Sequence, residues 1–184
     1  MQQNNFYIIT GGPGVGKTTL LNELQARGYK CIREAARNII KQQIDTGGDA
    51  LPWKDTRKYS DLMLLHSIRD FNRASGTTET VFFDRGIPDT YGYERLIGLR
   101  ASPELLNAVD EYRYNLMVFI LPPWKEIYEN DDERKQDFEE AIATFEMMKT
   151  IYSELGYLLI EVPLLPVDER CDFVLGQIKN QQST

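Results

Sequence analysis

The chain has 184 residues, of which 42% are hydrophobic and 27% charged, as is typical of a soluble globular protein. This length suits one domain, residues 1–184, with a sizeable core. The 21 basic and 28 acidic residues leave a net charge of −7, which argues against nonspecific nucleic-acid binding. No apolar stretch is long enough to span a membrane, and no signal peptide is evident. We therefore expect a cytoplasmic protein with neither nucleic-acid nor membrane partners.

The first predicted elements are a buried strand at 6–10, a glycine-rich loop and a helix that Gly28 ends. A short strand follows at 29–32, and then a helix at 33–44. That helix stops at the sequence DTGGDALPW, where two glycines and a proline predict a mobile loop at 45–54 on the acceptor side of the site.

The middle of the chain continues the alternation of helices and strands. A helix at 55–74 leads to the strand 80–84, and a short helix is expected after Pro88. Ser102 and Pro103 have the residue types that begin the next helix. The fourth strand is predicted at 115–121, where two prolines close it.

The last elements are a long amphipathic helix at 133–155, a fifth strand at 156–163 and a terminal helix. Near-continuous apolar strands separated by helices predict a parallel sheet covered on both faces. The expected fold is therefore a three-layer α/β/α domain with a five-stranded parallel sheet. Ligands of such folds bind at the carboxyl ends of the strands, here after residues 10, 32 and 83.

The cysteines and the single histidine indicate no metal site. Cys31 and Cys171 form neither a CxxC pair nor a metal-ligand pattern. We expect both to be buried free thiols in a reducing compartment, with a disulfide as the alternative. With His66 alone, multi-histidine metal sites and histidine-based nucleophile relays are excluded.

The sequence GGPGVGKTT matches the Walker A pattern G-x-x-x-x-G-K-[ST], after a strand and at the start of a helix. Its glycines allow backbone N–H groups to surround an anion, and the helix N-terminus adds its dipole. The lysine reaches the β- and γ-phosphates, and the threonine hydroxyl ligates Mg²⁺. The predicted ATP-binding residues are Gly11, Gly12, Pro13, Gly14, Val15, Gly16, Lys17, Thr18 and Thr19.

The strand sequence VFF delivers Asp84 to this site, where it has the form of the acid that holds Mg²⁺. In ATPases that activate water, a carboxylate usually follows this aspartate, whereas Arg85 follows it here. An arginine beside a phosphate suits an anionic ligand or a developing charge. The guanine-reading tetrapeptide N-K-x-D does not occur. Both features favour phosphoryl transfer to a bound acceptor.

The chain resembles the P-loop, AAA-type ATPase-like domains related to the nicotinamide-riboside kinase domain of bacterial NAD regulators, within the nucleoside and nucleotide kinase group. The resemblance covers nearly the whole chain, and "DRGIPD" is much more specific than the phosphate loop. It rests on GGPGVGKTTL, REAAR (33–37), FFDRGIPDTYGY (82–93), RYNLMVFILPPWKEIY (113–128), DDER (131–134) and LGYLLIEVP (155–163).

The resemblance implies roles for several charged residues. Glu34 falls where such kinases often place the acid that takes the acceptor's proton or holds a ribose; an N-terminal helix glutamate is the alternative. Residues 124–137 fall where related kinases carry a lid over the phosphates. Arg134 is the candidate there to stabilise charge, with Lys135 second.

Other positions stay open between two interpretations. Arg37 lies one helical turn from Glu34 and either binds an anionic acceptor or faces solvent. Asp89 either lines the site or caps a helix. Trp53 and Trp124 border the two predicted mobile segments, and each either stacks on a base or packs against protein.

The leading hypothesis is a kinase that uses ATP and Mg²⁺ to phosphorylate a small, nucleoside-like acceptor. The catalytic candidates are Lys17, Glu34, Asp84, Arg85 and Arg134, with Thr18 and Asp84 as metal ligands. Either Glu34 or Asp84 is the base. The alternative is a nucleotide-dependent binding module with slow or no hydrolysis. The acceptor, the preference for ATP over GTP and the oligomeric state are not specified by the sequence.

Overall fold

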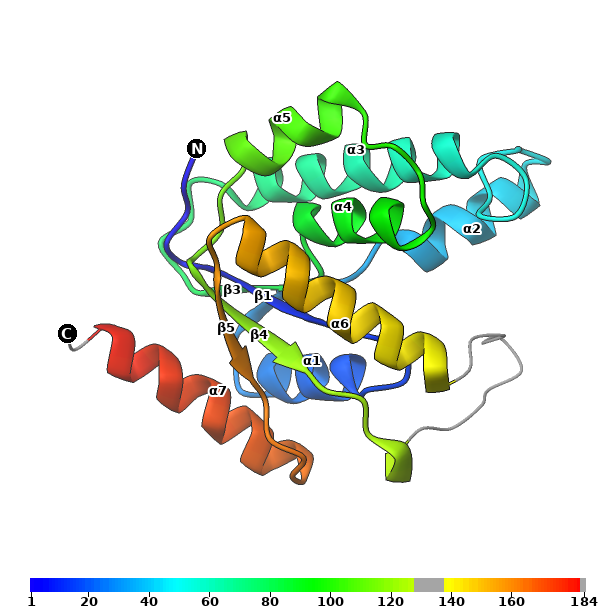
Figure 1. Ribbon diagram of the computed structural model, residues 1–184. Coiled ribbons are helices and arrows are strands. Elements are labelled where there is room, and N and C mark those ends of the chain that lie inside the picture. Colours follow the sequence, from blue (N-terminus) through cyan, green and yellow to red (C-terminus); the bar gives the residue numbers. More distant parts are fainter. Residues whose placement is uncertain (128–137, 183–184) are drawn as a thin grey trace.

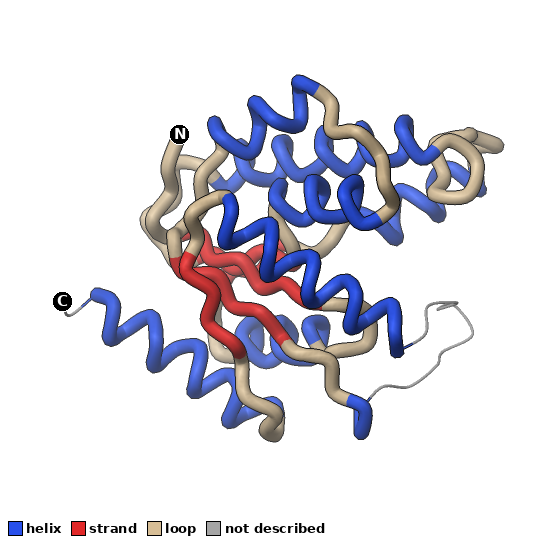
Figure 2. Tube along the Cα trace, in the orientation of Figure 1, coloured by secondary structure: helices blue, strands red, loops and turns tan. Residues whose placement is uncertain are grey.

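The structure is a computed structural model that describes residues 1–127 and 138–182. Its five strands form one parallel sheet in the order β2-β3-β1-β4-β5 (Figures 1 and 2). The strands are β1 (Phe6–Gly11), β2 (Lys30–Ile32), β3 (Val81–Asp84), β4 (Met117–Leu121) and β5 (Leu158–Glu161). The predicted five-stranded parallel sheet is confirmed.

Helices cover both faces of the sheet (Figure 1). One layer holds α1 (Lys17–Ala26) and α7 (Val167–Gln182). The other holds α3 (Thr56–Ala74), α4 (Ile87–Leu96), α5 (Pro103–Glu111) and α6 (Phe138–Glu154). In the same picture α2 (Ala36–Asp45) lies beside the first turns of α3. The three-layer α/β/α architecture is therefore as predicted.

The two cores follow from the alternation of side chains along the central strand. Phe6 and Ile8 of β1 belong to the core beneath α3 to α6, whereas Tyr7 and Ile9 belong to the core beneath α1 and α7. All six residues of β1 are buried, because successive side chains point to opposite faces and both faces are covered.

Helix boundaries follow the local signals with one correction. Ser102 caps α5 by accepting a hydrogen bond from Leu105 N at 3.1 Å, with Pro103 as the first helical residue. The helix predicted at 33–44 begins instead at Ala36. Arg33 is held outside it, because its guanidinium donates to Gln25 Oε1 of α1 at 3.0 Å.

Other expectations have mixed outcomes. The helix predicted at 133–155 is described from Phe138 onward, and residues 128–137 lie outside the described part of the chain. Both cysteines are free thiols as predicted, although Cys31 is half-buried and Cys171 fully buried. None of the described helices combines the length and apolarity needed to cross a membrane.

Replacing Phe71 by alanine tests the core above the sheet. This ring is 0% exposed and meets the rings of Phe6, Tyr112 and Tyr114 edge-on. We expect Phe71→Ala to lower the free energy of unfolding by about 3 to 5 kcal/mol in a denaturant titration. Leu65 on the same helix is 59% exposed, and Leu65→Ala is the matched control with a change within about 0.5 kcal/mol. Equal losses in the two variants would contradict this description of the core.

Candidate active site

The Walker A loop leaves the carboxyl end of β1 and enters α1 at Gly16, which takes a left-handed conformation with φ of 86°. Two of its glycines are required by close packing. A Cβ on Gly11 would lie 2.6 Å from the carbonyl oxygen of Leu121, and one on Gly12 would lie 2.6 Å from that of Ala141. The loop is therefore held between the end of β4 and the first turn of α6.

Lys17 lies within this loop and is only 8% exposed. Its ammonium donates to the carbonyl oxygens of Gly11 at 3.1 Å and Gly12 at 2.6 Å. Burial, together with the nearby Arg85 guanidinium, lowers the pKa of Lys17 to about 8, although carboxylates around it oppose the shift. The lysine side chain is thus already folded over the loop that is predicted to receive phosphates.

Asp84 ends β3 and is paired in register with Ile9 of β1, so it lies beside the start of the loop. Its Oδ1 atom is buried and has no hydrogen-bond partner among the described residues. Burial raises the pKa of Asp84, while the Lys17 charge acts in the opposite direction. An oxygen without a donor is suited to a cation, so this residue fits the predicted role in holding Mg²⁺.

Arg85 follows with a φ of 68°, a left-handed conformation that is uncommon for a residue with a side chain. Its backbone N–H donates to the carbonyl oxygen of Ile9 at 3.0 Å. Its Nε atom lies 2.9 Å from Glu34 Oε1, and one terminal nitrogen lies 3.2 Å from Asp89 Oδ1. Burial lowers the pKa of Arg85, but the surrounding carboxylates outweigh it and the pKa is raised. The turn directs this arginine between two acids.

Asp89 performs both of the functions that its sequence position allowed. It is 5% exposed and caps α4, since its Oδ2 accepts from Gly86 N at 2.8 Å. The same carboxylate faces the site, where it accepts from Arg85, from the Thr10 hydroxyl and from the Tyr152 hydroxyl. One position of the Asp89 carboxylate thus serves both to cap α4 and to bind residues of the site.

The structure brings together most of the predicted site residues. Glu34, Asp84, Arg85 and the Walker A loop meet at the carboxyl edge of the sheet, as the topology predicts. Arg37 is exposed on α2 and has no ion pair with another described residue. Arg134 falls outside the described residues, so its role stays a prediction.

Sequence reasoning missed three residues of this region. Thr10 and Tyr152 both bind Asp89, and Arg170 of α7 packs against the Walker A loop at Gly16. None of the three stands in a motif, and each contacts a residue that is far from it in the sequence. The signals for them were weak: Thr10 is a polar residue at the end of an apolar strand, and Arg170 a charge on a helix with an apolar inner face.

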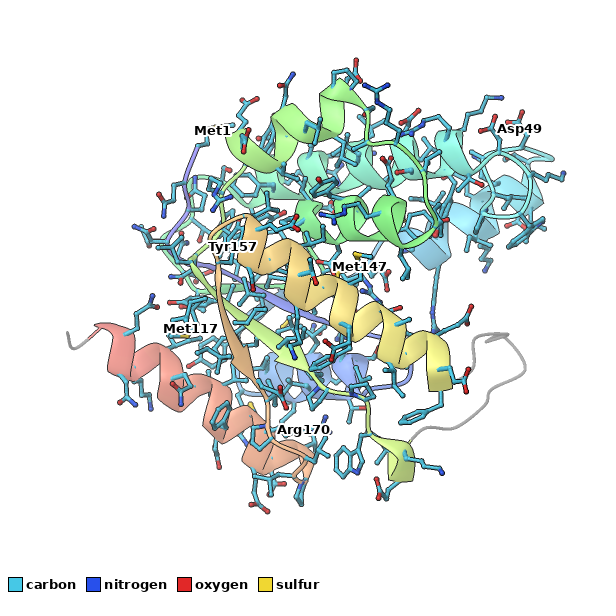
Figure 3. The ribbon with its side chains drawn as sticks, viewed as in Figure 1. Met1, Asp49, Met117, Met147, Tyr157 and Arg170 are labelled. Carbon is cyan, nitrogen blue, oxygen red and sulfur yellow. The ribbon has the colours of Figure 1, made fainter. Side chains whose placement is uncertain are left out.

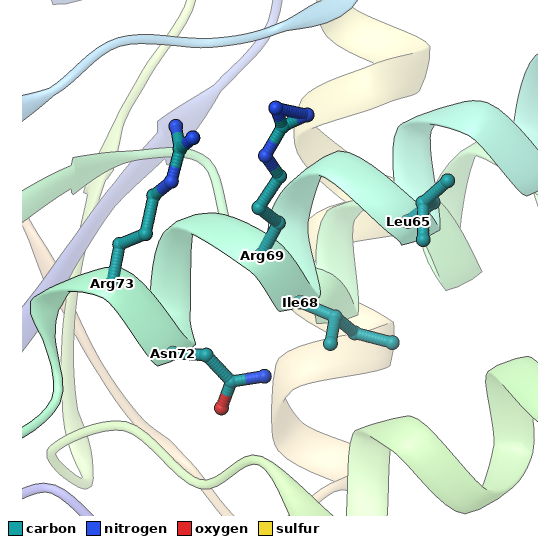
Figure 4. Close-up of a pocket in the computed structure, with 5 residues that line it drawn as sticks. All are labelled: Leu65, Ile68, Arg69, Asn72 and Arg73. Carbon is teal, nitrogen blue, oxygen red and sulfur yellow. The ribbon is translucent and has the colours of Figure 1, made fainter.

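A surface hollow elsewhere does not coincide with this chemistry. It is lined by Leu65, Ile68, Arg69, Asn72 and Arg73, all on α3 (Figure 4). None of these residues belongs to the Walker A loop or to the strand ends. The convergence of charged groups, rather than this hollow, defines the candidate active site.

The described residues contain no cluster of three or more histidine, cysteine, aspartate or glutamate side chains that could hold a metal by itself. A magnesium ion here would need ligands beyond one carboxylate and one hydroxyl. Mg²⁺ commonly takes one or two protein oxygens together with substrate phosphates, and Asp84 with Thr18 matches that pattern.

Comparisons with known proteins agree with the fold. The profile of an AAA domain family matches residues 6–170. The chain belongs to this AAA domain family. The predicted resemblance to P-loop, nucleotide kinase-like domains is thereby confirmed. Comparison with curated proteins gave no match.

Solved structures similar to this AAA domain include nucleoside kinases. Deoxyadenosine kinase from M. mycoides, with products dCMP and dCDP, has a TM-score of 0.64 at 15% identity, covering 95% of this chain and 98% of that one. YorR protein from Bacillus subtilis, in complex with phosphorylated GDP, has a TM-score of 0.61 at 14% identity, covering 97% and 98%. NadR protein in complex with NR has a TM-score of 0.64 at 18% identity over 85% of this chain, but only 45% of NadR is covered. At these identities the likeness shows the fold alone.

Replacing Asp89 by asparagine tests the buried charge. The asparagine amide retains the shape of the side chain but removes the negative charge beside Arg85. The positive charge of the buried guanidinium is then balanced by fewer carboxylates. We expect a loss of about 3 kcal/mol in the free energy of unfolding by urea titration. Asp110→Asn, at an exposed position on α5, is the control and should change it by less than about 0.5 kcal/mol. A loss no larger than that of the control would show that Asp89 is dispensable for the fold.

The pKa of Lys17 predicts a pH effect on stability without nucleotide or Mg²⁺. Between pH 8 and about 10.5 the unfolded chain keeps a proton that folded Lys17 has lost. The free energy of unfolding should therefore rise with pH across this window, by up to about 1.4 kcal/mol per pH unit from this group. Denaturant titrations of Lys17→Met should lack that component, whereas Lys41→Met, at an exposed position, should retain it. Parallel profiles for the wild type and Lys17→Met would disprove the shift.

Proposed function

We propose that this AAA domain, as a single unit spanning residues 1–184, is a kinase that transfers the γ-phosphoryl group of ATP to a small, nucleoside-like acceptor. One observation carries the proposal: the Arg85 guanidinium, next to the Lys17 ammonium, is shared between Glu34 and Asp89. Groups that suit a donor phosphate and groups that suit an acceptor hydroxyl thus form one cluster. The kinase-like fold supports the same reaction class.

The donor would bind with its phosphates in the Walker A loop. Backbone N–H groups of the loop and the N-terminus of α1 favour an anion, and Lys17 supplies a positive charge beside it. Thr18 and Asp84 would hold Mg²⁺, which when bound neutralises phosphate charge and favours the leaving group.

Glu34 is the proposed base. Its Oε1 atom is held by Arg85, which fixes the carboxylate at the end of β2 on the acceptor side. The acceptor hydroxyl oxygen forms a bond to the γ-phosphorus, the bond to the ADP oxygen breaks, and the hydroxyl proton passes to the carboxylate. Arg85 stabilises the charge that develops on the transferring group. Asp84 is the alternative base, and Arg134 is a further proposed source of positive charge.

Aromatic rings near Glu34 support a nucleoside-like acceptor. Tyr59 of α3 and Tyr93 of α4 pack edge-on, with ring centroids 5.9 Å apart. Burial and then the Glu34 carboxylate raise the pKa of Tyr59, which shows that this ring lies near the proposed base. Rings beside a proton acceptor suit a planar base attached to a sugar hydroxyl.

The test is ADP release from Mg²⁺·ATP in the presence of a panel of nucleosides, nucleoside monophosphates and nicotinamide riboside. At least one acceptor should raise turnover far above the water background. Glu34→Gln should lower that acceptor-dependent rate by about 10²- to 10⁴-fold while ATP binding is retained, because only the proton acceptor is lost. Asp84→Asn should instead raise the Mg²⁺ concentration needed for half-maximal turnover, because a proposed metal ligand is lost.

Lys17→Ala is the inactive reference, and Glu104→Gln, at an exposed position on α5, is the matched control that should behave as the wild type. If ATP binds but no acceptor on the panel changes the rate, the kinase proposal is wrong. The alternative of a nucleotide-dependent binding module would then be the better description.

A further inference from the structure

The two carboxylates that share Arg85 differ in how completely they are hydrogen-bonded. Asp89 is 5% exposed, and each of its oxygens accepts two hydrogen bonds. Its Oδ1 atom accepts from Arg85 at 3.2 Å and from the Thr10 hydroxyl. Its Oδ2 atom accepts from Gly86 N at 2.8 Å and from the Tyr152 hydroxyl. An ionised carboxylate has about four acceptor sites, so a proton on Asp89 would have to displace one of these donors.

Glu34 is bound much less completely. Its side chain is 31% exposed, and its ion pair in the described part of the chain joins Oε1 to Arg85 Nε at 2.9 Å. A carboxylate that reaches solvent and keeps acceptor sites free can take up a proton without displacing a donor. Of the two acids, Glu34 is therefore suited to change its charge during a reaction, and Asp89 is suited to keep its charge.

A change of charge at Glu34 affects Arg85, because only 20% of the arginine side chain is exposed. In the proposed reaction the acceptor's proton passes to Glu34, which becomes neutral and no longer balances the guanidinium. A buried charge that loses its partner is strongly unfavourable. Asp89 lies on a different nitrogen of the same guanidinium, so its ion pair with Arg85 does not depend on Glu34.

The two hydroxyls that bind Asp89 come from elements that also hold the Walker A loop. Thr10 lies in β1, directly before the first glycine of that loop. Tyr152 lies in α6, and the carbonyl oxygen of Ala141 in the same helix packs against Gly12. The position of Arg85 is thus set by the elements that position the loop for the donor phosphates.

We infer, as a deepening of the proposed kinase function on which this rests, that Asp89 is a fixed counter-ion that keeps Arg85 in place while Glu34 is protonated. The hydroxyls of Thr10 and Tyr152 orient the Asp89 carboxylate for this role. All three are positioning residues, because they act on the transferring group through Arg85. The acceptor oxygen bonds to the γ-phosphorus as its proton passes to Glu34, and no proton reaches Asp89.

The first test replaces Glu34 by glutamine, which has the shape of the protonated side chain and no charge. Urea midpoints are measured without nucleotide for Glu34→Gln, Asp89→Asn and the double variant. While Asp89 is present, Glu34→Gln should barely move the midpoint, since Arg85 keeps a counter-ion. In the double variant both ion-pair partners of Arg85 are lost, so the midpoint should fall by clearly more than the two single shifts together. Additive shifts would overturn the inference.

The second test removes one hydroxyl at a time and measures turnover with Mg²⁺·ATP and an acceptor from the panel above. Tyr152→Phe and Thr10→Val should each lower the acceptor-dependent kcat about tenfold, as for the loss of one hydrogen bond to a charged group. The KM for the acceptor and the Kd of Mg²⁺·ATP should stay within about twofold, because Arg85 acts on charge that develops during transfer. In an Arg85→Ala background, Tyr152→Phe should cause no further loss.

Tyr157→Phe is the matched control for Tyr152→Phe. Tyr157 lies just beyond the end of α6 (Figure 3), and its ring packs edge-on against Tyr152 with centroids 5.4 Å apart. Its buried hydroxyl has no hydrogen-bond partner among the described residues. Removal of this hydroxyl should therefore leave kcat at the wild-type value.

Three outcomes of the turnover experiment overturn the inference. A wild-type kcat in either Tyr152→Phe or Thr10→Val would show that these hydroxyls do not position Arg85, and it would leave the proposed function intact. A further tenfold loss when Tyr152→Phe is added to Arg85→Ala would show that Tyr152 supports the fold rather than the arginine. A wild-type protein without acceptor-dependent turnover would refute the proposed function and this inference together.

Discussion

The buried carboxylate of Asp89 is the interaction on which the rest of the site depends. It joins Thr10 at the end of β1, the turn after β3, the N-terminus of α4 and Tyr152 of α6. A desolvated carboxylate is stable only with several donors, and here they come from β1, from the turn between β3 and α4, and from α6. Satisfying this one charge therefore fixes the angles at which strands and helices meet, and it holds Arg85 in a left-handed conformation that isolated chains rarely adopt.

Charged side chains of opposite sign lie together at the carboxyl edge of the sheet. Burial makes the cationic form of Lys17 and the anionic form of Asp84 less favourable, so the pKa of the first is lowered and that of the second is raised. An arriving phosphate would stabilise the lysine charge, and a cation would stabilise the aspartate charge. A bound phosphate and a bound cation would thus offset the unfavourable burial of these two charges. That property is expected where binding energy is used to position reacting groups.

The fold could be predicted well from the sequence because the signals for its elements are local. Buried strands appear as apolar runs, and the glycine loop has a fixed spacing that requires no distant partner. The start of α2 was placed wrongly because Arg33 and Glu34, in a segment with helical residues, are held outside the helix by contacts with α1 and Arg85. Tyr152 was missed for a similar reason, since its hydroxyl meets Asp89 across the core and 63 positions apart in sequence.

The shape of the proposed acceptor side depends on how α3 and α4 pack. Glu94 of α4 is fully buried and accepts from Ser60 and Arg57 of α3, each at 2.6 Å. This polar contact sets the position of one helix on the other and brings Tyr59 and Tyr93 together near Glu34. The shape of that region thus depends on the position of one helix relative to the other, and no short sequence motif specifies that position. The proposed transfer chemistry can be inferred from the loop and the strand ends, whereas the specificity of the proposed acceptor site would depend on side-chain pairs between helices.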